Sequence, residues 1–299
     1  MFKRKRIILA FFSIVFLASF CLYFIYTETV SCAQNYKSFA ALEDKVATIA
    51  KGFSGEYSYI IKDIEKPYCE ISRNENKMFP AASVIKLPIA AVAFNAAKEG
   101  KVSLSQKFTI TAKDITGGSG IIKTMQPPVV LTFQEIIETM IVNSDNTATN
   151  KIIDILGYKY LNRGFRELGL RRTVIKRKMM DFSNRKHGVE NYTSVSDIVF
   201  LLEKIYKGKL IDKESSQMIL SFLGKQKIND RIPRYLPKNV KVAHKTGLER
   251  GVVHDAGIIF SSRGDCVVCV FTKKVKDYSK AKKFIARLSL ATYNNLREQ

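Results

Sequence analysis

Three short motifs, far apart in the chain, constrain its fold most strongly. S-V-I-K spans residues 83–86, S-D-N spans residues 144–146 and K-T-G spans residues 245–247. Each string alone is common. Together they offer a hydroxyl beside an amine, a second hydroxyl beside an amide, and a cation beside a third hydroxyl, which is the equipment of acyl transfer. These groups act together only in a fold that brings three distant parts of the chain to one point.

The first motif is predicted to open a helix. Pro88 fits only in a first helical turn, so the helix must begin close to Ser83. Residues three apart share a helix face, which aims the Lys86 amine at the Ser83 hydroxyl as its base. Ser144 can relay a proton and Asn146 can hold an amide. The alternative for S-D-N is a plain helix cap, and for S-x-x-K a capping serine with a surface lysine.

The third motif is predicted to end a strand. Lys245 and Thr246 can bind a carboxylate together, and Gly247 lets a substrate approach the backbone closely. His244 precedes this motif and faces the other side of the strand by alternation. The histidines lack metal-ligand spacing, and no phosphate-binding or dinucleotide motif is present, so we expect no metal and no cofactor.

Hydrophobic spacing places a helical block between two groups of strands. It predicts helices over residues 84–97, 133–142, 146–156, 158–168, 196–207 and 279–296, and strands over 55–63, 68–73, 240–245, 255–261 and 266–273. We therefore expect an α+β fold with an antiparallel sheet from both chain ends, flanked by helices. Residues 34–82 and 240–299 would form the α/β region, and residues 83–239 the inserted all-helical region.

The N-terminus has the layout of an export signal. The basic run KRKR at residues 3–6 precedes a nearly unbroken apolar run over residues 7–26. That run is also long enough to span a bilayer, so residues 1–33 are either a signal peptide, cleaved after Ala33, or a membrane anchor. Lipid modification of Cys32 is a third alternative. In every version the body is exported to the periplasm or another extracytoplasmic space.

The net charge of +22 over 299 residues suggests a polyanionic partner. Export and the lack of a nucleic-acid motif exclude nucleic acid from our expectations. The basic residues are spread along the chain, which favours a solvated lysine-rich surface over a site for anionic lipid or wall polymer.

The cysteines indicate core packing more than chemistry. Cys266 and Cys269 lie three apart in a predicted strand and so face opposite sides, which is unsuitable for chelation or a mutual bridge. A bond from Cys69 to either of them stays open for an exported chain.

Longer matches surround the three motifs. They are ITGGSGIIK at residues 115–123, MIVNSDNTATN at 140–150, RIPRYLP at 231–237 and HDAGI at 254–258. With them the chain resembles the class A β-lactamase family of penicillin-recognising serine enzymes over nearly everything after the export segment.

The resemblance implies a monomer that acts on a β-lactam or a peptidoglycan-peptide-like small molecule. It also implies roles for individual residues: Ser83 is acylated, Lys86 is the base, Ser144 relays the proton, Asn146 holds the acylamide, Lys245 and Thr246 bind the carboxylate, and the Ser83 and Leu248 N–H groups form the oxyanion hole.

One departure from the family concerns the second base. The family's E-x-x-L-N loop, which activates the deacylating water, has no counterpart between residues 169 and 196. Asp181 aligns best and Glu190 lies near the loop's exit, but a helix cap or turn and a loop-tying charge are their respective alternatives. With water activation the chain is a β-lactamase. Without it, the chain is a penicillin-binding D,D-peptidase or a slowly deacylating β-lactam or wall-peptide binding protein.

Overall fold

The computed structural model describes residues 38–66 and 68–298. The predicted export segment or anchor, with Cys21 and Cys32, lies outside these residues. Within the described ranges, no helix is both long enough and apolar enough to span a membrane.

A five-stranded antiparallel sheet forms the centre of the fold, in the order β2-β1-β9-β8-β7. Its strands are β1 (Glu56–Asp63), β2 (Glu70–Arg73), β7 (Val242–Glu249), β8 (Val252–Ile259) and β9 (Cys266–Lys273). β1 pairs with β9 along its whole length, so the two chain ends build one sheet. The predicted α+β fold with an antiparallel sheet from both ends is therefore confirmed. The order leaves β7, which carries K-T-G, at one edge of the sheet.

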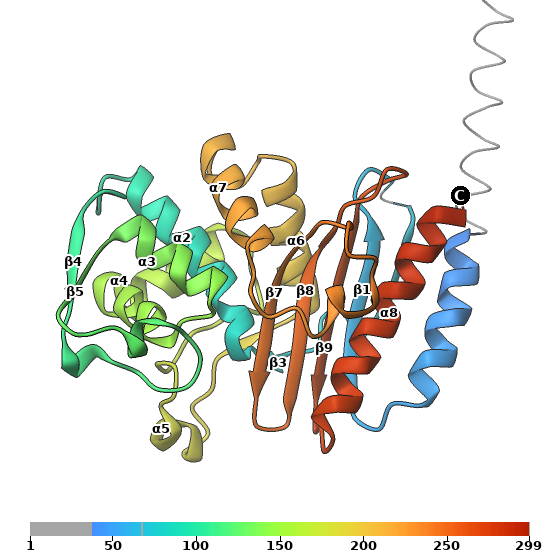
Figure 1. Ribbon diagram of the computed structural model, residues 1–299, viewed down its shortest axis with the longest axis horizontal. Helices are drawn as coiled ribbons and strands as arrows, with labels where there is room; N and C mark the ends of the chain where they lie inside the picture. Colours follow the sequence, from blue (N-terminus) through green and yellow to red (C-terminus); the bar gives the residue numbers. More distant parts are fainter. Residues whose placement is uncertain (1–37, 67, 299) are drawn as a thin grey trace, which may run out of the picture.

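Helices cover both faces of this sheet and extend past the β7 edge (Figure 1). The helix over residues 38–51 and α8 (Tyr278–Glu298) pack on one face. The other face and the β7 edge adjoin the helical block: α2 (Lys86–Lys98), α3 (Phe133–Val142), α4 (Asn146–Glu167), α5 (Phe182–Lys186), α6 (Val195–Tyr206) and α7 (Lys213–Gly224). Two apolar cores thus lie on opposite sides of the sheet and hold its edge against the helices.

Strand alternation assigns the cysteines to these two cores. Cys266 packs in the core under α8, and Cys269 packs in the core shared with the helical block. Their predicted opposite orientation is confirmed, because successive side chains of a strand alternate between its faces. No disulfide joins Cys69, Cys266 and Cys269 to one another in the described residues. Burial raises the pKa of the Cys266 and Cys269 thiols, which makes both poor nucleophiles.

α4 contains the two helices predicted over residues 146–156 and 158–168, and the predicted break between them is confirmed at Gly157, where φ is 74°. Other predicted boundaries were wrong. β7 continues through Glu249, and β8 begins at Val252, because these two residues pair across a tight turn. K-T-G therefore lies inside its strand and not at its end. α7 and the small β4–β5 sheet (Lys107–Ile110 with Val129–Thr132) were not predicted; each of these two strands has only four residues.

Candidate active site

The first motif opens α2 as predicted. Ser83 lies in the 3₁₀ turn η1 (Ala82–Ile85), and α2 starts at Lys86 with Pro88 in its first turn. Ala82 has a φ of 44°, a left-handed conformation that is uncommon for a residue with a side chain. Such strain is often found at functional sites. It presents Ser83 at a cavity wall directly before the helix.

The Lys86 amine is fully buried and is held by the second motif. Its Nζ donates to the Ser144 carbonyl at 2.5 Å, to Asn146 Oδ1 at 2.8 Å and to Ser144 Oγ at 3.3 Å. In the described part of the chain no hydrogen bond joins Lys86 to the Ser83 side chain. The fold thus places the amine beside Ser83 but uses Ser144 and Asn146 to orient it.

The second and third motifs meet at Ser144. Lys245 Nζ donates to Ser144 Oγ at 2.9 Å, so this hydroxyl lies between the amines of two lysines. Ser144 has a φ of 51° in the turn between α3 and α4. The Asn146 side chain reaches onward, and its Nδ2 donates to the Gly117 carbonyl at 2.9 Å. Residues from three distant parts of the chain therefore form one connected polar group.

Asp145, the middle residue of S-D-N, is a structural residue. It caps α4 by accepting from the Ala148 N–H at 2.9 Å, and it also accepts from the Ile122 N–H at 2.9 Å. A Cβ on Gly120 would lie 2.2 Å from Asp145 Oδ2, so only glycine fits there. Asp145 thereby fixes the segment over residues 115–123 at the mouth of the site. The helix-cap alternative applies to this residue, while its two neighbours contact the lysines.

Burial sets the protonation of the two lysines. Both are fully buried, and neither forms an ion pair with a carboxylate in the described residues. Loss of hydration, with repulsion from Lys245, lowers the pKa of Lys86 well below its usual value despite Asp145 nearby. Burial also lowers the pKa of Lys245 to about 7, although Asp255 opposes this shift and Arg231 adds to it. A neutral Lys86 amine can accept a proton from a hydroxyl.

The third motif packs against the start of α2. A Cβ on Gly247 would lie 3.1 Å from Val84 Cγ2 and 3.2 Å from His254 Cβ. This glycine lets β7 approach the nucleophile's turn, a packing role beyond the predicted approach of substrate. His244 faces away, as alternation predicted, with its Nδ1 at 2.9 Å from Asp255 Oδ1 and its Nε2 at 3.0 Å from Asn229 Oδ1.

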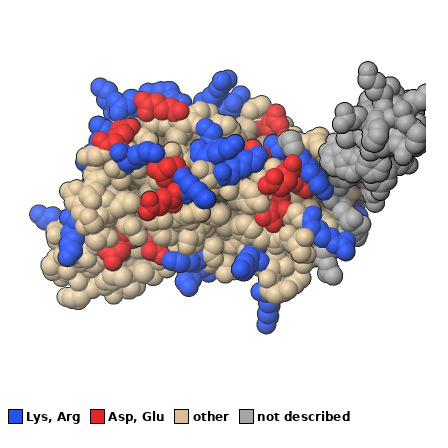
Figure 2. Space-filling view, turned by 90° about the horizontal axis from the view of Figure 1, so that it is seen from above, with Lys and Arg blue, Asp and Glu red and all other residues tan. Residues whose placement is uncertain are grey.

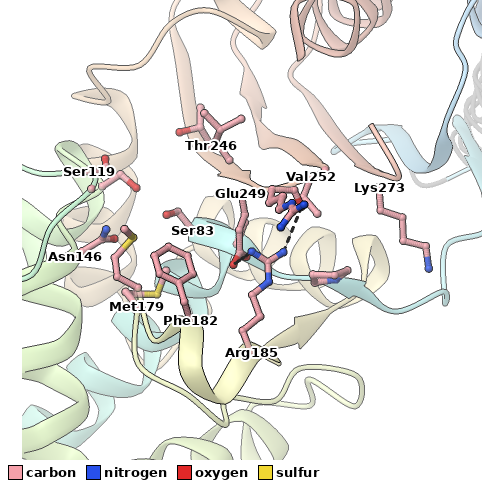
Figure 3. A pocket seen from close by; sticks show the side chains of 18 of the residues that line it. Ser83, Ser119, Asn146, Met179, Phe182, Arg185, Thr246, Glu249, Val252 and Lys273 are labelled. Carbon is pink, nitrogen blue, oxygen red and sulfur yellow. Dashed lines mark hydrogen bonds and ion pairs between the residues drawn. The ribbon is translucent and has the colours of Figure 1, made fainter. Parts of the chain in front are cut away.

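A cavity of about 1180 Å³ opens over these groups. Its walls include five of the predicted residues: Ser83, Ser144, Asn146, Thr246 and Leu248. The buried lysines lie just behind this wall. Figure 3 shows Ser83 in the middle of the cavity, with Thr246 on one side and Asn146 and Ser119 on another. The site lies between the helical block and the sheet edge.

Arg231 is a cavity residue that the sequence reasoning did not single out. It is 1% exposed, and its Nε and Nη1 atoms form no hydrogen bond. Nη1 lies 3.0 Å from Asp230 Oδ1, close enough for an ion pair but without hydrogen-bond geometry. A buried guanidinium with unused donors is suited to bind a carboxylate. RIPRYLP contains this arginine, but no residue type in that string marks it as buried.

Asp181 does not line the cavity. It caps α5, accepting from the Asn184 N–H at 3.0 Å and from Asn184 Nδ2 at 2.6 Å. These hydrogen bonds from Asn184 lower the pKa of the Asp181 carboxyl, which weakens it as a base. Its observed contacts are those of the helix-cap alternative.

Glu190 also lies outside the cavity wall. Its carboxylate is 2.7 Å from Arg177 Nη2 and 3.4 Å from Arg185 Nε, and it accepts from the Asn191 N–H at 2.8 Å. Burial raises the pKa of Glu190, with repulsion from Glu249 as a second cause. These contacts tie the two ends of the loop together, as its loop-tying alternative predicts.

Met179 occupies the loop side of the cavity (Figure 3). Its N–H donates to Asn150 Oδ1 at 2.8 Å, and Asn150 Nδ2 donates to its carbonyl at 3.2 Å. Among the described residues, the carboxylates lining the cavity are Asp230 and Glu249. Glu249 lies 2.6 Å from Arg177 and 2.9 Å from Arg185, and Asp230 lies 2.6 Å from Lys282. The loop that carries Met179 thus presents a thioether to the cavity, and both carboxylates that line the cavity are ion-paired.

In the described ranges, no group of three or more His, Cys, Asp or Glu side chains is placed to hold a metal ion.

A hydroxyl at a helix start, backed by a buried amine and a second hydroxyl, defines a serine enzyme of the acyl-transfer class. The β-lactamase enzyme family matches residues 41–296, and the chain belongs to this family. β-Lactamase VEB-1 of Pseudomonas aeruginosa is 27% identical over 240 residues, covering 74% of this chain and 79% of its own. These matches confirm the resemblance to class A β-lactamases.

Solved structures support the same assignment. A β-lactamase from Sphaerobacter thermophilus superposes with a TM-score of 0.79 at 28% identity, covering 87% of this chain and 98% of its own. PBP-A superposes with a TM-score of 0.78 at 29% identity, covering 87% and 97%. A mutant of PBP-A has been solved as an acyl-enzyme with penicillin G. The similarity therefore includes both a β-lactamase and PBP-A.

Proposed function

We propose that this protein opens β-lactam amides through an ester on Ser83 and then hydrolyses that ester. The observation that carries the proposal is the buried Lys86 amine, held beside Ser83 by Ser144 and Asn146. Burial lowers the pKa of Lys86 well below its usual value, which favours the neutral amine that a general base requires. Family membership supports the same reaction.

In acylation, Ser83 Oγ attacks the β-lactam carbonyl carbon while its proton passes to Lys86. The C–N bond then breaks, and the ring nitrogen takes a proton from Ser144, which is replaced from the lysine pair. The hydroxyl of Ser144 is suited to this relay because it is hydrogen-bonded to both amines. In deacylation, water adds to the ester carbonyl, and the acid leaves as Ser83 is restored.

Three cavity features would orient the substrate. Lys245, Thr246 and Arg231 would bind its carboxylate, and the unused donors of Arg231 support that role. Asn146 would bind the acylamide. The N–H groups of Ser83 and Leu248 would stabilise the oxyanion, which is usually a large contribution to acyl transfer.

Deacylation is the slow step in this proposal. On the loop side, the cavity wall presents the thioether of Met179, and the two carboxylates that line the cavity, Asp230 and Glu249, are ion-paired. The same observation favours the second candidate, a penicillin-binding D,D-peptidase or a binding protein that holds its acyl group. Similarity to PBP-A at 29% identity supports it too.

Mass spectrometry of the protein mixed with benzylpenicillin separates these candidates. We expect an adduct on Ser83 that forms quickly and disappears as penicilloate accumulates. An adduct that persists for hours would favour the second candidate, and release of D-alanine from a muramyl-peptide mimic would identify a peptidase. No adduct at all would overturn both.

Acylation is expected to slow as pH rises through about 7, the pKa of Lys245. Below this pH the ammonium of Lys245 is charged and attracts the substrate carboxylate, whereas above it the charge is lost. The measurement is the second-order acylation constant across the pH range.

Lys245→Arg provides the matched control, since arginine keeps its charge at all these pH values. This variant should acylate more slowly overall, but the alkaline fall should disappear. A fall that persists in Lys245→Arg would assign it to another group.

Asp181→Asn is expected to leave the deacylation rate unchanged. Asparagine caps helices about as well as aspartate, so the start of α5 is preserved while the carboxylate is removed. The adduct lifetime on Ser83 measures the outcome. An adduct lengthened by roughly 10²-fold or more, the lower end of general-base effects, would make Asp181 the water-activating base.

We also propose that the protein is exported, because the basic run and the apolar segment over residues 7–26 have the layout of an export signal. Whether that segment is cleaved or retained as an anchor is decided by the N-terminal sequence of the protein isolated from cells.

A further inference from the structure

The cavity extends well beyond the reacting groups, and its far end is basic. Its wall follows β7 from Thr246 to Glu249 and continues around the β7–β8 turn to Lys273. Seven basic and two acidic residues line the whole cavity, and their imbalance is concentrated at this far end. The basic residues of the far end are Arg185, Lys186, Arg250, Lys273 and Lys274.

Little acidic charge offsets this end. The side chains of Lys186 and Arg250 are exposed, and in the described part of the chain neither forms an ion pair. Lys273 and Lys274 share a single carboxylate, Glu56, at 3.3 Å and 2.5 Å. Lys77 also reaches Glu56, at 2.7 Å. The far end therefore has spare cationic groups.

Glu56 shows how this surrounding acts on a carboxylate. Hydrogen bonds from Lys274 and Lys77 hold the pKa of Glu56 down to about 2. A carboxylate placed here is thus kept in its charged form by lysines. By contrast, the face seen in Figure 2 has basic and acidic side chains intermingled. The excess of basic over acidic side chains is therefore larger at this end of the cavity than on that face.

Distance defines what can reach this end. Glu249 lies three residues beyond Thr246 along β7, about 10 Å at the usual rise of a strand, and Arg250 follows at the turn. Along β7, Leu248 lies between Thr246 and Glu249, and Phe182 also lines the cavity; these two apolar side chains are 50% and 49% exposed. A ligand spanning both ends would therefore need an apolar middle.

We propose that the basic end, formed by Lys186, Arg250, Lys273 and Lys274, binds a second carboxylate at the far end of the substrate's acyl chain. This inference rests on the proposed function and names its substrate class: amides with one carboxylate next to the leaving nitrogen and another beyond an apolar stem. The first carboxylate binds at Lys245, Thr246 and Arg231. The stem crosses the apolar wall, and the second carboxylate pairs with Lys186 and Arg250.

A matched set of penicillins tests the proposal on the full-length protein. Their side chains are dicarboxylic acyl chains of increasing length, each compared with its own methyl ester, with benzylpenicillin as reference. We expect the longer free acids to acylate Ser83 about fivefold faster than their esters at low salt, the scale of one exposed ion pair. High salt should remove this preference, because the basic groups are exposed.

Two double variants locate the effect. K186E/R250E should lose or reverse the preference while keeping its acylation rate with benzylpenicillin. K113E/K209E changes the net charge equally at exposed lysines outside the cavity wall and should keep the preference. Equal rates for acids and esters in the natural protein, or a preference surviving in K186E/R250E, would overturn the inference. Failure of benzylpenicillin to label the protein at all would instead overturn the proposed function.

Discussion

Ser83→Ala is expected to abolish both covalent labelling by benzylpenicillin and its turnover. Ser83 lies on the cavity wall directly before the helix that carries Lys86, whereas the other hydroxyl near this amine, Ser144 Oγ, also accepts from Lys245. The variant should remain folded, because Ser83 Oγ forms no hydrogen bond in the described residues and its loss leaves no partner unsatisfied. Intact-mass measurement after incubation, together with thermal unfolding, tests both halves of this expectation.

Ser119→Ala is the matched control, since Ser119 lines the same cavity and donates to the Asn143 carbonyl at 3.3 Å without contacting either buried lysine. It should label at close to the natural rate. Turnover that survives in Ser83→Ala would contradict the acyl-Ser83 scheme, whichever group then carried the reaction.

Met179→Glu is expected to shorten the life of the acyl-enzyme by roughly 10²–10⁴-fold, the usual range for general-base help. The backbone of Met179 is fixed on both sides by Asn150, so a glutamate there would be held at the loop side of the cavity. From that place it can take a proton from a water attacking the ester. Acylation should change much less, because Lys86 and Ser144 are untouched.

Met179→Gln separates basicity from shape. Glutamine has the size and polarity of glutamate but cannot take a proton at neutral pH, so its adduct should last about as long as that of the natural protein. Equal acceleration in both variants would point to improved water access. No acceleration in Met179→Glu would mean that the loop already presents a working base, and would make Asp181 and Glu190 candidates again.

The amino-acid sequence carried most of the acylating half of the site. S-V-I-K, S-D-N and K-T-G identified Ser83, Lys86, Ser144 and Lys245, and the structure brings the last three into one hydrogen-bonded group. Their order also agreed with the fold, because a sheet from both chain ends brings the last motif beside the first. Pro88 placed the helix start by a local rule that needs no tertiary context.

The deacylating half was decided by tertiary contacts. Asp181 was the favoured base from its position in the loop, but its side chain turns to the N–H and amide of Asn184. Glu190 pairs with Arg177 and Arg185. A carboxylate's availability depends on which partners the loop brings to it, and the spacing of residues along a loop does not fix this.

Local sequence patterns determined the acyl-transfer chemistry of this chain, because the nucleophile and the neighbouring amine are about one helical turn apart at the start of the same helix. Only the tertiary structure decided the lowered pKa values of Lys86 and Lys245, since burial is the main cause of both, with repulsion from Lys245 added at Lys86 and from Arg231 at Lys245. It also decided the place of Arg231, a guanidinium buried with unused donors, and the basic end of the cavity at Lys186 and Arg250. Burial and contacts between residues far apart in the chain arise from packing across the whole fold, so a short sequence motif cannot predict either of them.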